Sequence, residues 1–466
     1  MKEIFIEDTL KFINKRVTLY GWVWNFRDHG KLIFFDLKDR SGILQAVIDS
    51  TNPGFQILKK SKYGALKVEG IIQKRPENLI NPKIKTGEIE LKVEKLEVLS
   101  SSLVPPFPLE TEGYEISEEL RLKYRYLDLR RERLFRNLLY RHKTILFIRN
   151  WLTERGFVEI ETPILTKSTP EGARDYVVPS RLYPGKFYAL PQSPQQYKQL
   201  LMIAGFEKYF QIARCFRDED PRGDRQPEFT QLDIEISWVE DQEEILSLIE
   251  NLYLDLVKEL FPEKKITKVP FPRLKYQEVI EKYKTDKPDL RENKNDPNEL
   301  AFAFIVDFPM FEWKETEKRW DAVHHPFVKI KRTGTKKDLI EKLEKEPQSL
   351  LAFQYDFVCN GYEIGGGSLR ETDIDILIKV FEVMGNKKED IEKKFGHLIE
   401  AFKYGVPPHG GIAPGIDRFL MVIFNEPSIR EVIAFPKTGE GQDLMMNSPD
   451  NLDEEKLKEL KIKIID

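Results

Sequence analysis

The sequence predicts an α+β protein, with a small five-stranded β-barrel followed by a larger antiparallel sheet flanked by helices. Three patterns support this prediction. Five short segments of strand-like alternation, separated by turn signals, fill residues 16–99. Two longer alternating segments, residues 209–216 and 229–238, flank a charged loop and are typical of a β-hairpin. Residues 127–155 carry leucine and isoleucine at helical spacing.

Length and composition indicate a soluble chain with more than one domain. Of its 466 residues, 41% are hydrophobic and 33% charged, which suits two or three packed domains. No apolar run reaches the roughly 18 residues of a membrane span, and the first ten residues do not resemble a signal peptide. With only Cys215 and Cys359, neither a disulfide framework nor a cysteine-rich zinc site is available. We therefore expect a cytoplasmic protein without membrane contact.

Charge is distributed unevenly along the chain. The net charge is −4, but residues 1–100 contain 18 Lys and Arg against 13 Asp and Glu, so this part carries +5 and the remainder −9. The overall value argues against a uniformly basic nucleic-acid coat. The sequence instead predicts a mildly basic N-terminal module attached to an acidic body.

The N-terminal module has the strand count and size of an OB-fold barrel. Its five predicted strands cover residues 17–26, 32–39, 42–49, 65–74 and 87–100. Arg27, Phe34 and Gln45 would give one face a cation, a stacking ring and an amide for base edges. The alternative is that Phe34 belongs to the barrel core, and spacing alone favours that alternative.

A proline cluster marks the expected domain boundary. Pro105, Pro106 and Pro108 interrupt the periodic pattern and indicate a stiff linker. We expect a barrel domain over residues 1–103, a linker over 104–120 and a second domain over 121–466.

The second domain is predicted to begin with a long amphipathic helix over residues 127–155. Gly156 ends it, and residues 157–164, which include Pro163, continue as a strand. The apolar face of the helix is buried either within one subunit or against a second one. Pattern alone does not separate these two arrangements, because both bury one face.

The loop between the two long strands is dense in charge, and its charged residues are Arg217, Asp218, Glu219, Asp220, Arg222, Asp224 and Arg225. The planar fork of an arginine suits phosphate oxygens, and a neighbouring carboxylate can orient it or hold a metal. A solvated hairpin loop with mutually neutralising charges is the alternative. The sequence contains neither a P-loop nor a Rossmann fingerprint, so a nucleotide would not be held in those ways.

Taken with the rest of the chain, this hairpin resembles motif 2 of the class II aminoacyl-tRNA synthetases. The resemblance is closest to the bacterial aspartyl-tRNA synthetases and covers nearly the whole sequence. The helix at 127–155 and the strand with Pro163 are similar to motif 1, which forms the dimer interface in that family. The segment PHGGIAPGIDRFLMVIF is similar to motif 3, a strand that runs into a helix. The resemblance implies an OB-fold barrel, a class II catalytic domain and a homodimer.

The resemblance also implies a set of residues for each substrate. The aspartate site would comprise Glu171, in a mobile loop at 166–174, with Ser193, Gln195, Lys198, Arg217, Asp233, His324 and Arg370. The ATP site would comprise Arg217, Asp218, Glu219, Gln226, Glu363, Gly415, Ile416, Asp417 and Arg418. Of these, Arg217, Glu363 and Arg418 would be catalytic, with Arg217 on the α-phosphate and Arg418 on the γ-phosphate.

Asp356 and Glu363 match the carboxylates that hold Mg²⁺ on ATP in the family. Their odd separation would place them on opposite faces of one strand, unless Gly361 marks a bulge. His324 and His325, adjacent on an extended strand, would point apart and make a poor metal site. Polar contacts to aspartate and phosphate suit these histidines better.

The resemblance implies a two-step reaction. L-aspartate reacts with ATP to form aspartyl-adenylate, and the aspartyl group is then transferred to the 3′ end of tRNA. One alternative is a catalytically silent tRNA-binding protein, against which the intact Arg217, Glu363 and Arg370 argue. Another is an amide-forming ligase related to the class II core, which would not need the barrel. The insertion usual in bacterial members is reduced here to a short joint at residues 285–300.

The choice of tRNA depends on the barrel, where Arg27, His29, Phe34, Gln45 and Asn78 would contact the anticodon. A histidine at position 29 resembles family members that charge both tRNA(Asp) and tRNA(Asn), whereas Asn78 matches neither the relaxed nor the strict members. A neutral His29 can donate or accept a hydrogen bond and could tolerate either terminal anticodon base. We expect charging of both tRNAs, while a strictly tRNA(Asp)-specific enzyme, with His29 merely capping a turn, remains the alternative.

Overall fold

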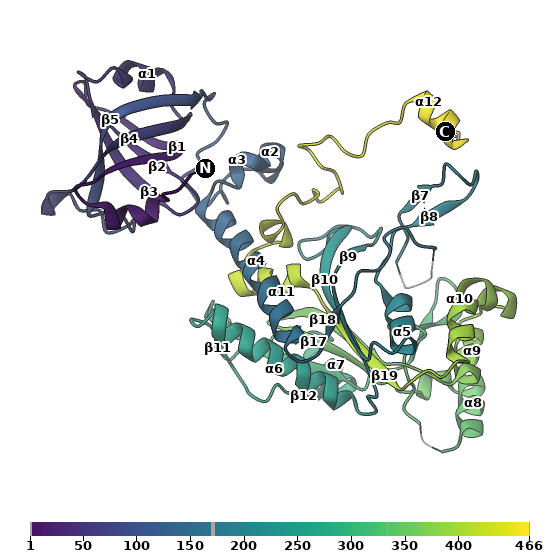
Figure 1. Cartoon of the computed structure of the whole chain (residues 1–466). Coiled ribbons are helices and arrows are strands. Elements are labelled where there is room, and N and C mark those ends of the chain that lie inside the picture. The colour runs from purple at the N-terminus through teal and green to yellow at the C-terminus, as the bar shows by residue number, and fades with distance from the viewer. Residues whose placement is uncertain (1, 169–172, 333, 466) are drawn as a thin grey trace. The chain divides into compact units, whose positions relative to one another are not determined.

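The computed structural model describes residues 2–168, 173–332 and 334–465, which form two compact units (Figure 1). The first unit contains residues 1–121 and 126–132, and the second contains 122–125 and 133–466. Each unit is built around its own large hydrophobic core.

Five strands of the first unit close into a barrel in the order β1-β2-β3-β5-β4, as the sequence predicts. They are β1 (Arg16–Asp28), β2 (Leu32–Lys38), β3 (Ile43–Asp49), β4 (Ala65–Lys74) and β5 (Ile89–Ser100). A short helix, α1 (Gly54–Lys60), connects β3 to β4. On β2, Ile33 and Phe35 enter the barrel core while Phe34 faces outward. The expectation from spacing that Phe34 belongs to the core is therefore wrong.

The second unit is organised around an eight-stranded sheet in the order β12-β14-β17-β18-β19-β10-β9-β6. These strands are β12 (Arg273–Lys275), β14 (Phe302–Val306), β17 (Gln354–Cys359), β18 (Tyr362–Leu369), β19 (His409–Pro414), β10 (Glu228–Ser237), β9 (Lys208–Phe216) and β6 (Val158–Glu159). The six central strands pair antiparallel, which confirms the predicted sheet. The two edge strands, β12 and β6, pair parallel with their neighbours.

Three two-stranded ribbons accompany the sheet, namely β7 (Val177–Pro179) with β8 (Phe187–Ala189), β11 (Lys265–Ile266) with β13 (Glu299–Leu300), and β15 (Phe311–Lys314) with β16 (Arg319–Ala322). The helices are α2 (Glu118–Lys123), α3 (Arg125–Asp128), α4 (Glu132–Thr153), α5 (Gln195–Ile203), α6 (Gln242–Leu260), α7 (Tyr276–Tyr283), α8 (Lys336–Lys345), α9 (Ile374–Val383), α10 (Lys388–Phe402), α11 (Ile416–Phe424) and α12 (Glu454–Leu460). Within the described residues, no helix is long and apolar enough to cross a membrane.

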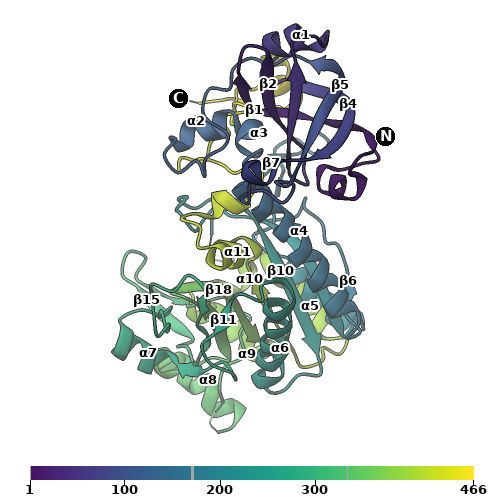
Figure 2. The same cartoon turned by 90° about the vertical axis from the view of Figure 1, so that its left-hand side faces the viewer.

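The central sheet has one apolar face and one polar face. Helices α4, α6 and α11 lie beside the central strands (Figures 1 and 2), and their apolar side chains pack in a single core with Leu232 and Ile234 of β10. Because side chains alternate along a strand, Gln231, Asp233 and Glu235 of β10 point to the opposite face. That polar face carries the candidate site.

The predicted helix over 127–155 is interrupted near its start. The structure ends α3 at Asp128 and begins α4 at Glu132. Between them the fully buried Arg131 donates hydrogen bonds to the Asp128 carboxylate and to the carbonyls of Thr111 and Pro108, each at 2.7 Å. We attribute the interruption to these contacts, since a buried guanidinium needs its acceptors.

Candidate active site

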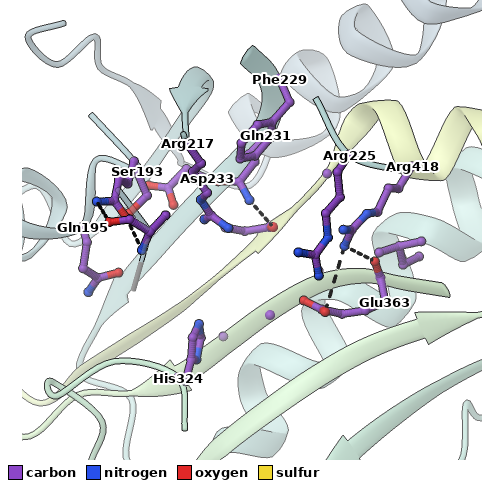
Figure 3. Close-up of a pocket in the computed structure, with 18 of the residues that line it drawn as sticks. Ser193, Gln195, Arg217, Arg225, Phe229, Gln231, Asp233, His324, Glu363 and Arg418 are labelled. Carbon is purple, nitrogen blue, oxygen red and sulfur yellow. Dashed lines mark hydrogen bonds and ion pairs between the residues drawn. The ribbon is translucent and has the colours of Figure 1, made fainter. Parts of the chain in front are cut away.

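A cavity of about 340 Å³ lies on the polar face of the sheet in the second unit (Figure 3). It is bordered by α5, by the β9–β10 hairpin, by β18 and by the start of α11. Most of the residues predicted for the aspartate and ATP sites line it, namely Ser193, Gln195, Lys198, Arg217, Glu219, Gln226, Asp233, His324, Glu363, Arg370, Gly415, Asp417 and Arg418. The fold thus gathers segments up to about 220 residues apart in the sequence around one cavity.

Four predicted residues are not among those that line the cavity. Asp218 turns outward, and its carboxylate lies 3.8 Å from the guanidinium of Arg174. Ile416 is fully buried in the hydrophobic core, while its neighbours Gly415 and Asp417 border the cavity. Asp356 lies beside the cavity, under Gly366. Glu171, predicted to close over the substrate, lies outside the described residues.

Two cations and two carboxylates form a buried cluster at one end of the cavity. Lys198 Nζ lies 2.7 Å from Asp233 Oδ1 and 3.3 Å from Glu235 Oε2. Arg370 donates two hydrogen bonds to Glu235, from Nε to Oε1 at 2.8 Å and from Nη2 to Oε2 at 3.0 Å. Burial alone would raise the pKa of Glu235, but Arg370 and Lys198 lower it to about 2. Glu235 is therefore ionised near neutral pH, whereas burial, only partly offset by Lys198, raises the pKa of Asp233.

The residue-level prediction missed Glu235. The signal was present, because Gln231, Asp233 and Glu235 alternate with apolar residues on one strand and must share a face. Once Asp233 is assigned to the site, the period of two places Glu235 beside it. Arg225, Phe229 and Gln231 also line the cavity and were likewise not predicted.

Several polar atoms around the cavity lack a hydrogen-bond partner among the described residues. They are Gln195 Nε2, Gln226 Nε2, Asp233 Oδ2, His324 Nδ1 and His325 Nδ1. A buried polar group without a partner costs about 1–3 kcal/mol. Unpaired groups that converge on one cavity indicate a polar ligand, with Asp233 Oδ2 as an acceptor for a cationic group.

The other end of the cavity carries arginines (Figure 3). The guanidinium of Arg217 lies 5.1 Å from the centre of the Phe229 ring and makes no ion pair with any residue that the structure describes. Arg418 donates to the carbonyls of Asp224 and Glu363 at 3.0 and 2.9 Å and lies 3.3 Å from the Asp224 carboxylate. Such preorganised cations suit phosphate oxygens.

The two adjacent histidines lie together rather than apart. Their ring centroids are 4.4 Å apart, because the chain bends at residues 323 and 324 and is not an extended strand there. Arg370 NH1 lies 2.7 Å from His325 Nε2, which accepts its hydrogen bond. Burial, reinforced by His324 and Arg370, lowers the pKa of His325 well below its usual range. A neutral His325 therefore helps to orient Arg370.

Asp356 and Glu363 come to one face through a bulge at an unpredicted position. Gly361, with φ +87°, belongs to the hairpin turn instead. The bulge lies within β18. Phe357 pairs with Gly365 and Val358 pairs with Glu363, so Ile364 is the extra residue.

The space between these two carboxylates suits a cation. A Cβ added to Gly366 would lie 3.3 Å from Asp356 Oδ1 and 3.7 Å from Glu363 Oε1. Burial and the charge of Glu363 raise the pKa of Asp356 well above its usual range, and a cation would relieve both effects. In the described ranges no group of three or more His, Cys, Asp or Glu could hold a metal by itself. Two carboxylates fit Mg²⁺, which keeps several waters and binds substrate phosphates.

The barrel presents a second group of predicted residues on its outer face. Arg27 donates to Gln45 Oε1 at 3.2 Å, and Arg27 is the cross-strand partner of Phe34. The rings of His29 and Phe34 meet edge-on at 5.7 Å. Asn78 is exposed in a short 3₁₀ turn, Glu77–Leu79.

One further residue of this face, Glu90, was not predicted. Its carboxylate accepts hydrogen bonds from Gln45 Nε2 at 2.9 Å and from Gln73 Nε2 at 2.8 Å. It ties the predicted amide to a neighbouring strand. The sequence did offer a signal for Glu90, because it is a polar residue on β5, the strand that pairs with β3.

An antiparallel sheet with two fixed arginines and a carboxylate pair on its polar face, preceded by an OB-fold barrel, defines a class II aminoacyl-tRNA synthetase. Residues 117–439 match the family described as tRNA synthetases class II (D, K and N), and residues 17–99 match an OB-fold nucleic acid binding domain. The chain belongs to this class II family of tRNA synthetases.

Relatives match the chain from end to end. It is 40% identical to the aspartate–tRNA(Asp/Asn) ligase of Dehalococcoides mccartyi, with 98% of each chain covered. It is 41% identical to the ligase of the same name from Thermoanaerobacter sp., covering 98% of this chain and 97% of the relative. It is 39% identical to the aspartate–tRNA ligase of Staphylococcus epidermidis, again with 98% of each covered. The first alignment spans 593 positions against 466 residues, so at least 127 positions have no counterpart here.

Solved structures agree in fold. The asparaginyl-tRNA synthetase of Pyrococcus horikoshii complexed with asparaginyl-adenylate superposes with a TM-score of 0.73 at 25% identity, covering 94% of this chain and 98% of that one. The aspartyl-tRNA synthetase of Entamoeba histolytica gives a TM-score of 0.71 at 23% identity, covering 93% and 91%.

Proposed function

We propose that this protein is an aspartate–tRNA ligase that uses ATP and Mg²⁺. The observation that carries the proposal is the buried cluster of Lys198, Arg370, Asp233 and Glu235 in a cavity that continues to Arg217 and Arg418. One end of the cavity thus suits a short amino acid with a second carboxylate, and the same cavity continues to a site for phosphates. The relatives named as aspartate–tRNA ligases support the same assignment.

The electrostatics of the cluster favour aspartate over the other two amino acids of the family. Lys198 and Arg370 bind the side-chain carboxylate, and the unpaired Asp233 Oδ2 accepts the ammonium group. Asparagine would offer these two cations a neutral amide in place of a carboxylate, and lysine would bring a third cation to them. Ser193, Gln195, Arg217 and His324 complete the aspartate site, with Glu171 as a further residue from outside the described part of the chain.

The ATP site occupies the arginine end of the cavity. Arg217 binds the α-phosphate and Arg418 the γ-phosphate, while Glu219, Gln226 and Gly415 border the nucleotide. Asp218 and Ile416, although predicted, contribute through backbone at most. Asp356 and Glu363 hold Mg²⁺, which supplies positive charge to the phosphates when bound.

Catalysis then consists of positioning and charge stabilisation, without a covalent enzyme intermediate. The aspartate α-carboxylate attacks the α-phosphorus, a bond forms to phosphorus, and pyrophosphate leaves with the bonding electron pair. Arg217 stabilises the charge that develops on the α-phosphate oxygens. A hydroxyl of the tRNA 3′-terminal ribose then attacks the activated carbonyl, and AMP leaves.

The barrel, residues 1–103, reads the anticodon of tRNA, and residues 104–120 link it to the catalytic domain at 121–466. Arg27, His29, Phe34, Gln45 and Asn78 form the contact set. Because neutral His29 can donate or accept, the barrel tolerates both terminal anticodon bases, and the enzyme charges tRNA(Asp) and tRNA(Asn). The protein works as a homodimer in the cytoplasm, where its two buried cysteines, which form no disulfide with any described residue, stay reduced.

Aminoacylation with labelled aspartate tests this function. Purified tRNA(Asp) transcript should be charged, and tRNA(Asn) transcript should be charged within about a thousandfold in kcat/KM, about 4 kcal/mol of discrimination. A larger gap would establish strict tRNA(Asp) specificity and leave the aspartate assignment intact. Tight tRNA binding without charging would instead favour a catalytically silent paralogue.

A further inference from the structure

Helix α4 carries a polar stripe along the side that faces α11. Arg133, Asn137 and Arg141 follow one another at intervals of four residues and therefore lie on one face. All three side chains reach α11 or the segment that follows it. Polar contacts between two packed helices are costly to bury, so each of them calls for a specific partner.

The first two residues of this stripe contact the segment after α11. Arg133 lies 2.5 Å from Glu426 Oε2 and 2.8 Å from Glu431 Oε2. Asn137 Nδ2 donates to Glu426 Oε1 at 2.6 Å. These contacts are buried, and they fasten the segment after α11 to α4.

The third residue, Arg141, contacts the beginning of α11. Its NH1 donates to Asp417 Oδ1 and, at 3.2 Å, to the carbonyl of Val432. The other oxygen of Asp417 accepts the backbone N–H of Thr230 on β10 at 2.8 Å. Asp417 is 3% exposed and ties α4, β10 and α11 together at a single carboxylate.

Asp417 therefore has no oxygen directed only at the nucleotide, although the resemblance implied that it belongs to the ATP site. Both oxygens accept hydrogen bonds from protein donors, and a carboxylate would repel phosphate in any case. Its neighbour Arg418 is the cation that faces the cavity, and both residues lie in the first turn of α11. The orientation of that turn decides where the Arg418 guanidinium lies.

We propose that Arg141 is a positioning residue for ATP, which acts through Asp417 to fix Arg418 against the terminal phosphate. The inference rests on the proposed function, because it takes Arg418 as the γ-phosphate contact. Arg141 differs in this role from Arg133, whose partners lie after the C-terminal end of α11. Arg141 governs nucleotide binding, whereas Arg133 governs stability.

Calorimetric titration of the full-length protein with ATP and with AMP tests this proposal. Arg141→Met should weaken ATP binding by about ten- to a hundredfold, as for a misplaced binding group, and leave AMP binding within about twofold. Arg141→Lys should restore most of the affinity. Arg133→Met should lower the melting temperature without a selective loss of ATP affinity. The matched surface control is Arg155→Met, at a residue just after the end of α4, which removes a contact to Asp255.

Equal weakening of ATP and AMP in Arg141→Met, or ATP affinity within twofold of the parent, would overturn the proposal and leave Arg141 a purely structural residue. If Arg141→Met does not fold, Asp417→Asn in the same titrations decides, since it keeps the shape and loses the charge. A selective loss of ATP supports the inference, and its absence refutes it. A parent protein that binds no ATP would instead refute the proposed function.

Discussion

The guanidinium of Arg370 is held by Glu235 at 2.8 and 3.0 Å, and both side chains are almost wholly buried. Lys198 lies against the same carboxylate. The two cations proposed for the aspartate side chain are thus fixed before substrate arrives, so that little reorganisation remains to be done on binding. The same pairing also makes Glu235 dependent on Arg370.

Replacing Arg370 should separate catalysis from stability. In Arg370→Leu we expect aspartate-dependent pyrophosphate exchange to be lost while ATP binding stays measurable. Glu235, left with Lys198 as its only cation among the described residues, should also lower the free energy of unfolding by about 3–5 kcal/mol. The double variant Arg370→Leu with Glu235→Leu should regain stability in urea titration but no exchange activity. Recovery of exchange in the double variant would show that Arg370 serves only to neutralise Glu235.

Arg217 and Arg418 should each contribute several kcal/mol to the activation step. Replacing either by alanine is expected to lower pyrophosphate exchange by about a hundredfold or more, as for preorganised groups facing developing phosphate charge. Arg319→Ala on the β15–β16 ribbon, where the arginine pairs with Glu317 and Asp321, is a matched control that should retain activity. Losses below tenfold at both positions would place ATP elsewhere.

An exposed apolar stripe on α4 should form the subunit interface. Phe135, Leu139 and Leu146 share one helical face and are 38%, 39% and 48% exposed, which is unusual for large apolar residues so close together. Leu139→Glu with Leu146→Glu should convert a dimer to a monomer in sedimentation at micromolar concentration. Leu103→Glu, at a residue 89% exposed in the first unit, should leave the dimer intact. A fully active parent monomer would contradict the dimer proposal.

Acid should weaken the fold through His325. The pKa of His325 is lowered in the folded protein. As the pH falls below about 6.5, the unfolded chain therefore binds a proton that the folded chain does not bind. The free energy of unfolding should therefore decrease as the pH is lowered through this window. For each pH unit the decrease should be about 1.4 kcal/mol larger in the parent protein than in His325→Gln. Glutamine retains an acceptor for Arg370. Parallel curves from pH 7 to pH 5 would show that His325 does not titrate as its burial implies.

Strand patterns in the sequence were sufficient for the barrel and the β9–β10 hairpin, because each depends on local periodicity. The resemblance supplied most of the residues around the cavity. Phe34 was misjudged for another reason, since the period of two places it on the face of Asp36 and Lys38, opposite Ile33 and Phe35.

The missed features depend on contacts between distant parts of the chain. The bulge at Ile364 arises from pairing with β17, and the interruption before α4 arises from carbonyls 20 or more residues away from Arg131. The closeness of His324 and His325 reflects a bend that no local residue pattern indicated. Glu235 differs, because its alternation with Asp233 was visible in the sequence and only its partner Arg370 was not.

Pyrophosphate exchange without tRNA, measured for each of the twenty amino acids, tests the proposed function most directly. The buried cations Lys198 and Arg370 predict exchange with L-aspartate and, because a neutral amide offers them no carboxylate to bind, at least about a thousandfold lower kcat/KM for asparagine. Lysine should give no exchange. Robust exchange with asparagine or lysine, or none with aspartate, would contradict the assignment of this site to aspartate.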